Sequence, residues 1–285
     1  MKKSVWLWLL ATILTLALAY FQRISGPTYP VDEKIQFAGE KIDYSLDTSH
    51  GGDGDHQVKI KVNNHDIEGE LYWKRYKTND DLTFVKMIGD SEKLSALLPY
   101  QPPAGKLFYK VILVSGDKSA VIPGDGGVIL RFKSDVPAAV LIPHIIFIFA
   151  AMLLSTRTGL EYFNKGKNFK LLTILTFIFV IIGGFILGPI AQYYAFGEFW
   201  TGFLFGYDLT DNKILIGFIG WLLALIAIYK FKNPRRWIIF ASILLFIIFL
   251  IPHSLLGSEL DYSEGMDKPQ QGELSSSILS GLIND

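Results

Sequence analysis

The chain has 285 residues, of which 50% are hydrophobic and 14% aromatic, so it is more apolar than a typical soluble protein although 19% of it is charged. The formal net charge is zero, and residues 24–135 carry 14 Lys or Arg against 17 Asp or Glu, which excludes the basic face that nucleic-acid binding requires. The chain has no cysteine, so disulfides, thiolate metal sites and thiol nucleophiles are excluded as well.

The first segment, residues 1–23, combines two lysines with a long run of apolar and small residues. It fits either a signal peptide cleaved after the letters ALA or a retained transmembrane helix. We favour retention, because Trp6, Trp8, Tyr20 and Phe21 lie where aromatic residues anchor both ends of a membrane helix. Both alternatives place the following segment outside the cytoplasm.

Residues 27–135 alternate short β-rich runs with turn signals, which is typical of an all-β sandwich. In HQVKIKV, Val58, Ile60 and Val62 share one face of an extended chain and the lysines share the other, which predicts a half-buried strand. Further strands are expected in EGELYWKRY, LTFVKMI, KLSALLP, KLFYKVILV and GVILRFK, with turns at QPPAGK and GDGG.

The run from GELYWKRY to LSALLPYQPPAGKLFYKVIL resembles an immunoglobulin-like or fibronectin-like module, in which an aromatic strand precedes a hairpin of the form LP…PPAGKLxYxV. This resemblance implies an immunoglobulin-like β-sandwich. The whole chain also resembles an uncharacterised family of bacterial inner-membrane proteins with such an insert, which implies a location and a fold but no activity.

The loop SHGGDGDHQ places His50, Asp53, Asp55 and His56 close together in sequence. These side chains could supply imidazole and carboxylate ligands to a metal ion. The three glycines of the loop equally suit a tight hairpin connection, and the loop lacks the glutamate that ends an EF-hand. A turn is the favoured interpretation, and a metal site is the alternative.

Four further apolar segments predict an α-helical transmembrane bundle over residues 137–253, with spans at about 137–155, 171–193, 214–229 and 237–252. The chain is thus predicted to be a multi-domain membrane protein in which an all-β domain precedes this bundle.

The charges of the connecting loops predict the orientation of the chain. The loop at 156–170 has four basic residues against one acidic, and the loop at 230–236 has four against none, whereas 196–213 has three carboxylates and one lysine. By the positive-inside rule the first two loops are cytoplasmic, and the third is on the extracytoplasmic side together with the β-domain. The acidic tail, residues 254–285, is expected on that side too and is predicted to be flexible.

Two histidines, His144 and His253, follow a proline in or beside the apolar spans. An ionisable residue in a membrane span is a candidate functional residue. His144 could instead stabilise a kink at Pro143, by bonding the carbonyl that the proline frees four residues earlier. His253 lies at the outer end of the last span, where a solvated imidazole needs no special role.

The loop FGEFWTGFLFGYDLTDNK at residues 196–213 resembles the outer loop of the haem-handling proteins of cytochrome c maturation, where two histidines flank a tryptophan-rich segment. Phe196-Gly197 would stand for the family's Trp-Gly and Thr210 for its closing threonine. The resemblance implies that His144 and His253 ligate haem b and that Trp200, Tyr207 and Asp208 belong to its platform.

The same loop departs from that family by five extra residues, by Phe and Tyr in place of two tryptophans, and by a missing basic residue. An alternative needs no haem. The aromatic residues suit a membrane interface, and Thr210 or Asp211 could cap a helix that begins at Asn212.

Other catalytic motifs are not found in the sequence, which makes an enzyme the less favoured class. Gly183, Gly184 and Gly188 predict a face where a neighbouring helix approaches closely. We therefore expect a structural or interaction subunit of a membrane assembly. Its expected partners are the lipid membrane and other membrane or periplasmic proteins, with haem binding as the alternative function.

Overall fold

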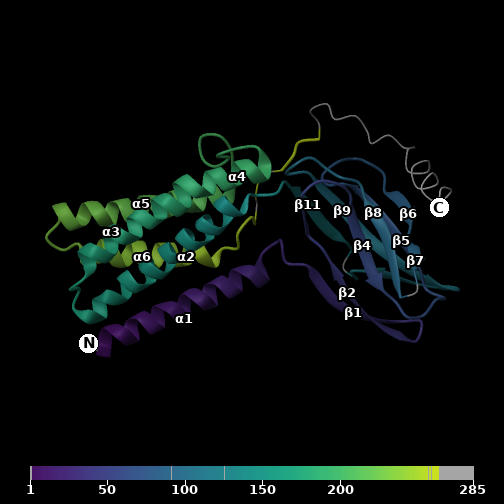
Figure 1. Cartoon of the computed structure of the whole chain (residues 1–285), viewed down its shortest axis with the longest axis horizontal. Coiled ribbons are helices and arrows are strands. Elements are labelled where there is room, and N and C mark those ends of the chain that lie inside the picture. The colour runs from purple at the N-terminus through teal and green to yellow at the C-terminus, as the bar shows by residue number, and fades with distance from the viewer. Residues whose placement is uncertain (1, 91, 125, 256, 258, 263–285) are drawn as a thin grey trace.

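The computed structural model describes residues 2–90, 92–124, 126–255, 257 and 259–262. A region of β-sheets lies beyond one end of a group of long apolar helices, as Figure 1 shows. Most of the tail that was predicted to be flexible, residues 263–285, lies outside the described residues.

The strands of the β-region, with their bounds, are β1 (Val31–Phe37), β2 (Glu40–Leu46), β3 (Ser49–Gly51), β4 (His56–Lys61), β5 (Glu68–Arg75), β6 (Thr83–Lys86), β7 (Ile88–Asp90), β8 (Lys93–Leu98), β9 (Lys106–Ser115), β10 (Lys118–Ile122) and β11 (Val128–Lys133). They form one sheet in the order β3-β11-β9-β5-β6, with β10 paired to β9, a second sheet in the order β4-β8-β7, and the pair β1-β2. The pairing of β3 with β11 is parallel, whereas the other described pairs are antiparallel.

Alternating side chains of these strands fill one hydrophobic core. Val58, Ile60 and Val62 are buried as the sequence predicted, and the six strands expected from the sequence are confirmed as β4, β5, β6, β8, β9 and β11. The prediction omitted β1, β2, β3, β7 and β10. Strand β2 does carry a readable pattern, because Ile42 and Tyr44 alternate with polar residues and are buried.

The helices, with their bounds, are α1 (Lys2–Ser25), α2 (Ala138–Leu160), the 3-10 turn η1 (Glu161–Asn164), α3 (Phe169–Val180), the π-helical segment η2 (Ile181–Leu187), α4 (Gly188–Phe196), α5 (Leu209–Lys230) and α6 (Arg235–Leu250). Four helical segments of the described chain are long and apolar enough to cross a membrane: Lys3–Ser25, Ala138–Asn164, Phe169–Phe196 and Leu209–Lys230. Helix α6 is apolar but has 16 residues, so its crossing stays a prediction.

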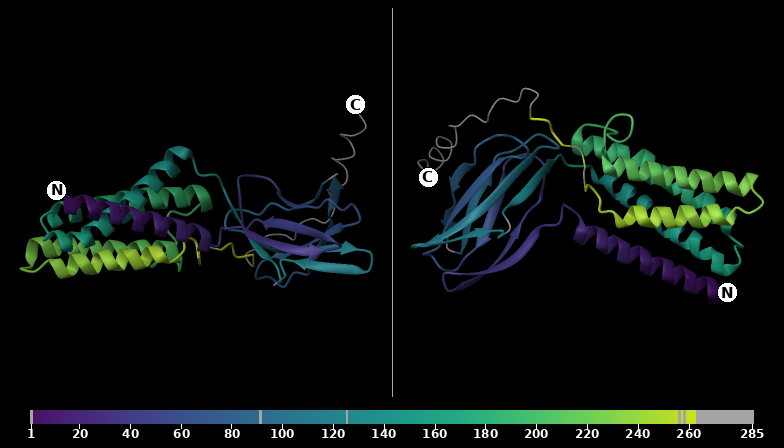
Figure 2. Two further views of the ribbon diagram at one scale, coloured as in Figure 1. Left: turned by 90° about the horizontal axis from the view of Figure 1, so that it is seen from below. Right: turned by 180° about the vertical axis from the view of Figure 1, so that it is seen from behind.

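The helices pack around a core that includes Trp221, Ala224 and Ala151, all fully buried. Figure 2 shows α1 running beside the other helices, with the start of the chain far from the β-region. The glycine face predicted in the third helix is confirmed, because a side chain at Gly183 would come within 2.9 Å of the backbone nitrogen of Ile148 in α2.

The prediction that residues 156–170 form a loop is wrong for its first part. Helix α2 continues to Leu160 and is followed by η1, and both Arg157 and Glu161 are buried. Their side chains form an ion pair of 2.6 Å, the Arg157 guanidinium lies over the ring of Trp8, and it donates to the hydroxyl of Ser4. The prediction of a solvated loop rested partly on the charges of Arg157 and Glu161. Because the two side chains pair with each other, they can be buried at the end of a helix.

Candidate functional site

The metal loop predicted from the sequence brings its two histidines together. Nδ1 of His56 lies 3.2 Å from Nδ1 of His50, whose Nε2 is 3.1 Å from the carbonyl oxygen of Gly54. The Asp55 carboxylate does not face this pair but accepts a hydrogen bond from the backbone of Tyr100. The described residues contain no group of three or more His, Cys, Asp or Glu arranged to hold a metal ion.

His144 bonds a partner that differs from the expected one. Its Nδ1 lies 3.0 Å from the carbonyl oxygen of Gly183, on the π-helical segment of the neighbouring helix, rather than from the carbonyl freed by Pro143. His253 follows the end of α6, and His144 lies near the start of α2. The structure thus brings the two membrane histidines to the same end of the helices.

The other three residues of the haem hypothesis make local contacts of their own. The ring of Trp200 stacks on Phe185, with 5.7 Å between ring centroids, and the side chain of Tyr207 is 96% exposed. Asp208 caps α5, because its carboxylate accepts from the backbone nitrogens of Thr210 and Asp211. Packing accounts for Trp200 and capping for Asp208 without haem, and the haem site stays a prediction.

The cap also corrects the predicted start of this helix. Asp208 is the N-cap instead of Thr210 or Asp211, so α5 begins at Leu209. Asp211 is buried and accepts from the backbone nitrogen of Thr201 and from the side chain of Gln192. These bonds fix the aromatic loop to the helix ends, which is a structural role.

The last described residues of the chain form a contact that the sequence did not predict. Residues 259–262, which we call the strap, return from α6 to the β-region and lie against the start of β9 and the turn after β5. They line a hollow of about 660 Å³ together with Arg75, Lys77, Asp80 and Lys106. We call this hollow the strap groove.

The Glu259 carboxylate is held between two lysines of the groove. Its Oε1 lies 2.6 Å from Nζ of Lys106 and its Oε2 lies 2.7 Å from Nζ of Lys77. Partial burial would raise the pKa of Glu259, but the hydrogen bonds from these two ammonium groups outweigh it and lower the pKa below its ordinary value. The same carboxylate raises the pKa of Lys77.

Tyr262 provides the second anchor of the strap. Its hydroxyl accepts a 2.8 Å hydrogen bond from the backbone nitrogen of Lys106 and lies 3.2 Å from the side-chain oxygen of Gln101. The guanidinium of Arg75 lies over its ring at 5.3 Å. Between the anchors, the backbone nitrogen of Leu260 donates to the carbonyl of Ala104.

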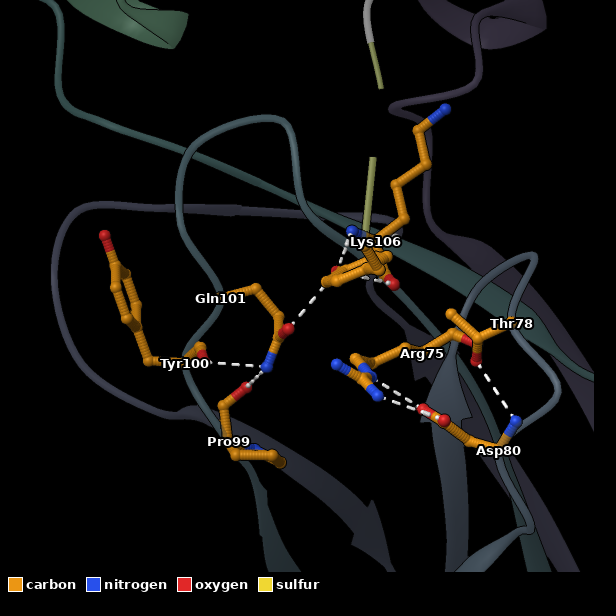
Figure 3. A network of polar contacts seen from close by, with 8 residues as sticks. Arg75, Thr78, Asp80, Pro99, Tyr100, Gln101 and Lys106 are labelled. Carbon is orange, nitrogen blue, oxygen red and sulfur yellow. Dashed lines mark hydrogen bonds and ion pairs between the residues drawn. The ribbon is translucent and has the colours of Figure 1, made fainter. Parts of the chain in front are cut away.

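Further polar contacts lie in and beside the groove, as Figure 3 shows. Arg75 forms two hydrogen bonds to the carboxylate of Asp80, at 2.6 and 3.1 Å, and the Gln101 amide donates to the carbonyls of Pro99 and Tyr100. Two-pronged pairing of arginine with a carboxylate fixes the orientation of the guanidinium. The groove can therefore present a cation–π surface and two ammonium groups at defined positions.

The strap differs from the flexible tail that was predicted from residue 254 onward. The composition of the strap did not predict that it binds the β-region, because its partners lie more than 150 positions earlier in the chain. The sequence offers one clue, which is complementary charge. Glu259 belongs to an acidic tail, and its partners Lys77 and Lys106 are basic residues of the β-region. Comparisons of the chain with protein-family models, curated proteins and solved structures gave no match.

Proposed function

We propose that this chain is a multi-pass protein of the bacterial inner membrane that presents an immunoglobulin-like β-sandwich on the extracytoplasmic side as a protein-interaction module. The four long apolar helices support membrane association. The excess of basic residues at 230–236, set against the acidic 196–213 loop, supports the orientation. The β-region lies at the end of the helices where α4 and α5 meet, which agrees with that orientation (Figure 1).

The occupied strap groove carries the interaction proposal. A short acidic segment with an aromatic residue is bound by charge-assisted hydrogen bonds to its carboxylate, by a cation–π contact to its ring and by one backbone hydrogen bond. These are the contacts by which a protein surface recognises an extended peptide. The partner class that fits is a membrane or periplasmic protein that presents an acidic, tyrosine-containing segment.

The strap would act as an internal competitor for that partner. A segment tethered to its site binds at a high effective concentration, so an external peptide binds well only when it makes better contacts or when the strap is weakened. Glu259→Gln combined with Tyr262→Phe removes one charge and one hydroxyl from the strap and leaves Arg75, Lys77 and Lys106, which contact it, unchanged. This double variant is therefore the form in which binding is best measured.

The test uses the full-length double variant in detergent and a fluorescent peptide with the sequence GSELDY. We expect saturable binding by fluorescence anisotropy at low salt, and we expect Lys77→Ala with Lys106→Met, added to the same background, to abolish it. Lys118→Ala is the matched control, because Lys118 is exposed and pairs with Ser115 at the opposite end of β9 from Lys106. Equal binding by the groove variant, or no binding by the released protein, would contradict the proposal.

A further inference from the structure

The two loop histidines place one ring nitrogen each within hydrogen-bonding distance of the other. His50 lies on β3 and His56 begins β4, so both rings are carried by paired strands. Their planes are inclined by 74° with 5.1 Å between the centroids, and His50 also packs edge-on against the buried Phe132. The two Nδ1 atoms therefore face each other across 3.2 Å from a rigid frame.

The outer nitrogens of both rings face oxygen acceptors. Nε2 of His50 lies 3.1 Å from the carbonyl of Gly54, which requires the proton of the neutral ring to be on Nε2. Nε2 of His56 faces the carboxylate of Asp47 at 3.7 Å, which favours a proton there too. When both protons occupy the outer nitrogens, the two Nδ1 lone pairs point at each other.

The remaining protonation states are less favourable. Moving the proton of His56 to Nδ1 creates a bond to His50 but turns the Nε2 lone pair toward the carboxylate of Asp47. Placing a charge on the His56 ring is opposed because this ring is buried. A cation between the two Nδ1 atoms satisfies every group at once.

We propose that His50 and His56 form a two-imidazole site for a divalent transition metal of the Zn²⁺ or Cu²⁺ type. Two nitrogens that each lie about 2.0–2.1 Å from a tetrahedral metal are about 3.3–3.4 Å apart, close to the separation found here. Histidine ligands of metals commonly donate their second ring N–H to a carbonyl or a carboxylate, which are the roles of Gly54 and Asp47. Water or a small anion completes the coordination, since the described residues offer no third ligand in place.

This site is independent of the strap groove and of the peptide proposal. Its residues lie at β3 and β4, whereas the groove is built from the end of β5 and the start of β9. Loss of metal binding therefore leaves peptide binding unchanged, and the failure of either proposal is distinguishable from the failure of the other.

The experiment is a titration of the metal-free, full-length protein in detergent, without a histidine tag, with Zn²⁺ by calorimetry and with Cu²⁺ by electron paramagnetic resonance. We expect one bound metal per chain and hyperfine coupling from two nitrogens. His50→Ala and His56→Gln should each weaken metal binding more than tenfold. Asp47→Asn should weaken it by about tenfold, which is the lower end of the range for groups that hold a ligand in place, because Asp47 is exposed.

His65→Ala is the matched control, since this histidine is exposed and lies outside the pair. Wild-type binding no tighter than that of the His50→Ala protein, or an equal loss in His65→Ala, would overturn the site. Because His56 is buried and its substitution could unfold the domain, a second measurement uses the intact protein. Nitrogen-15 spectra should show both Nδ1 atoms unprotonated after Zn²⁺ addition, and a retained Nδ1 proton on either ring would also overturn the proposal.

Discussion

At the scale of single residues, Arg157 and Glu161 show how two charged side chains are accommodated among apolar helices by pairing with each other. Both side chains are fully buried, and Glu161 also accepts hydrogen bonds from the side chains of Asn164 and Asn168. Removing one member of such a pair leaves the other charge without compensation, which costs more than replacing both by apolar residues.

We therefore expect Glu161→Gln to destabilise the protein by about 3–5 kcal/mol. The double variant Arg157→Met with Glu161→Met should recover a large part of this loss, because no buried charge is left. Thermal unfolding in detergent, measured for both singles and the double, checks the prediction. Glu198→Gln provides the control at an exposed carboxylate, and an unfolding midpoint for Glu161→Gln as high as for Glu198→Gln would contradict it.

At the scale of elements, α1 packs against the other helices through buried side chains. Leu7, Ala11 and Leu18 are buried, and the side-chain nitrogen of Gln22 donates to the carbonyl of Phe249 in α6. Trp8 covers the guanidinium of Arg157. Cleavage after the letters ALA would remove Leu7, Ala11 and Leu18 and leave the pair of Arg157 and Glu161 without its aromatic cover.

The expected outcome is a mature protein that retains α1. Intact-mass measurement of protein purified from the membrane through a C-terminal tag should show the full chain, and Trp8→Ala should lower the unfolding midpoint further than Trp6→Ala. Trp6 is the matched control because its side chain is exposed at the surface of the same helix. A mass that lacks the first 19 residues would disprove retention.

The accuracy of prediction from sequence differed between kinds of element for physical reasons. Strands such as β4 could be predicted, because alternation of buried and exposed side chains is a local property. The start of α5 was misplaced, since Thr210, Asp211 and Asp208 are all suitable caps by residue type and only the backbone decides among them. The pairing of Arg157 with Trp8 depends on the packing of two helices, which no local pattern contains.

The candidate sites follow the same rule. Proximity of His50 and His56 could be predicted from their short separation, although the contribution of Asp47 and the different role of Asp55 could not. The groove joins side chains far apart in the chain, so its discovery required the tertiary fold. Of the residues between the two membrane histidines, Trp200 packs on Phe185 and Asp208 caps α5, and neither role could be predicted from the resemblance.

At the scale of the whole molecule, the strap connects the end of the helices to the β-region through ionised groups. The pKa of Glu259 is held below its ordinary value of 4.5 in the bound strap, so binding of the strap is favoured above that pH. The contribution is lost as the pH falls through the lowered pKa, because the protonated carboxyl no longer pairs with the two lysines.

We expect the strap to be bound at pH 7 and to loosen in acid, below the pKa of free glutamate. Hydrogen exchange of the backbone nitrogen of Leu260, which donates to Ala104, reports the change after correction for the intrinsic pH dependence of exchange. In Glu259→Gln the strap should already be loosened at pH 7 and should respond less to acid. Protection in the wild type that is equal at pH 7 and pH 3 would contradict this account.

The path of the chain between its two regions has a mechanical consequence. The backbone passes between them after Ser25, after Lys133 and after Leu250, and the last passage ends in the strap. A domain joined by three separate connections cannot rotate about a single hinge. The contact of Arg131 in β11 with the ring of Phe196 in α4 restricts its motion further. A force applied to the β-region is thus transmitted to the ends of α1, α2 and α6. Release of the strap removes one of these three connections.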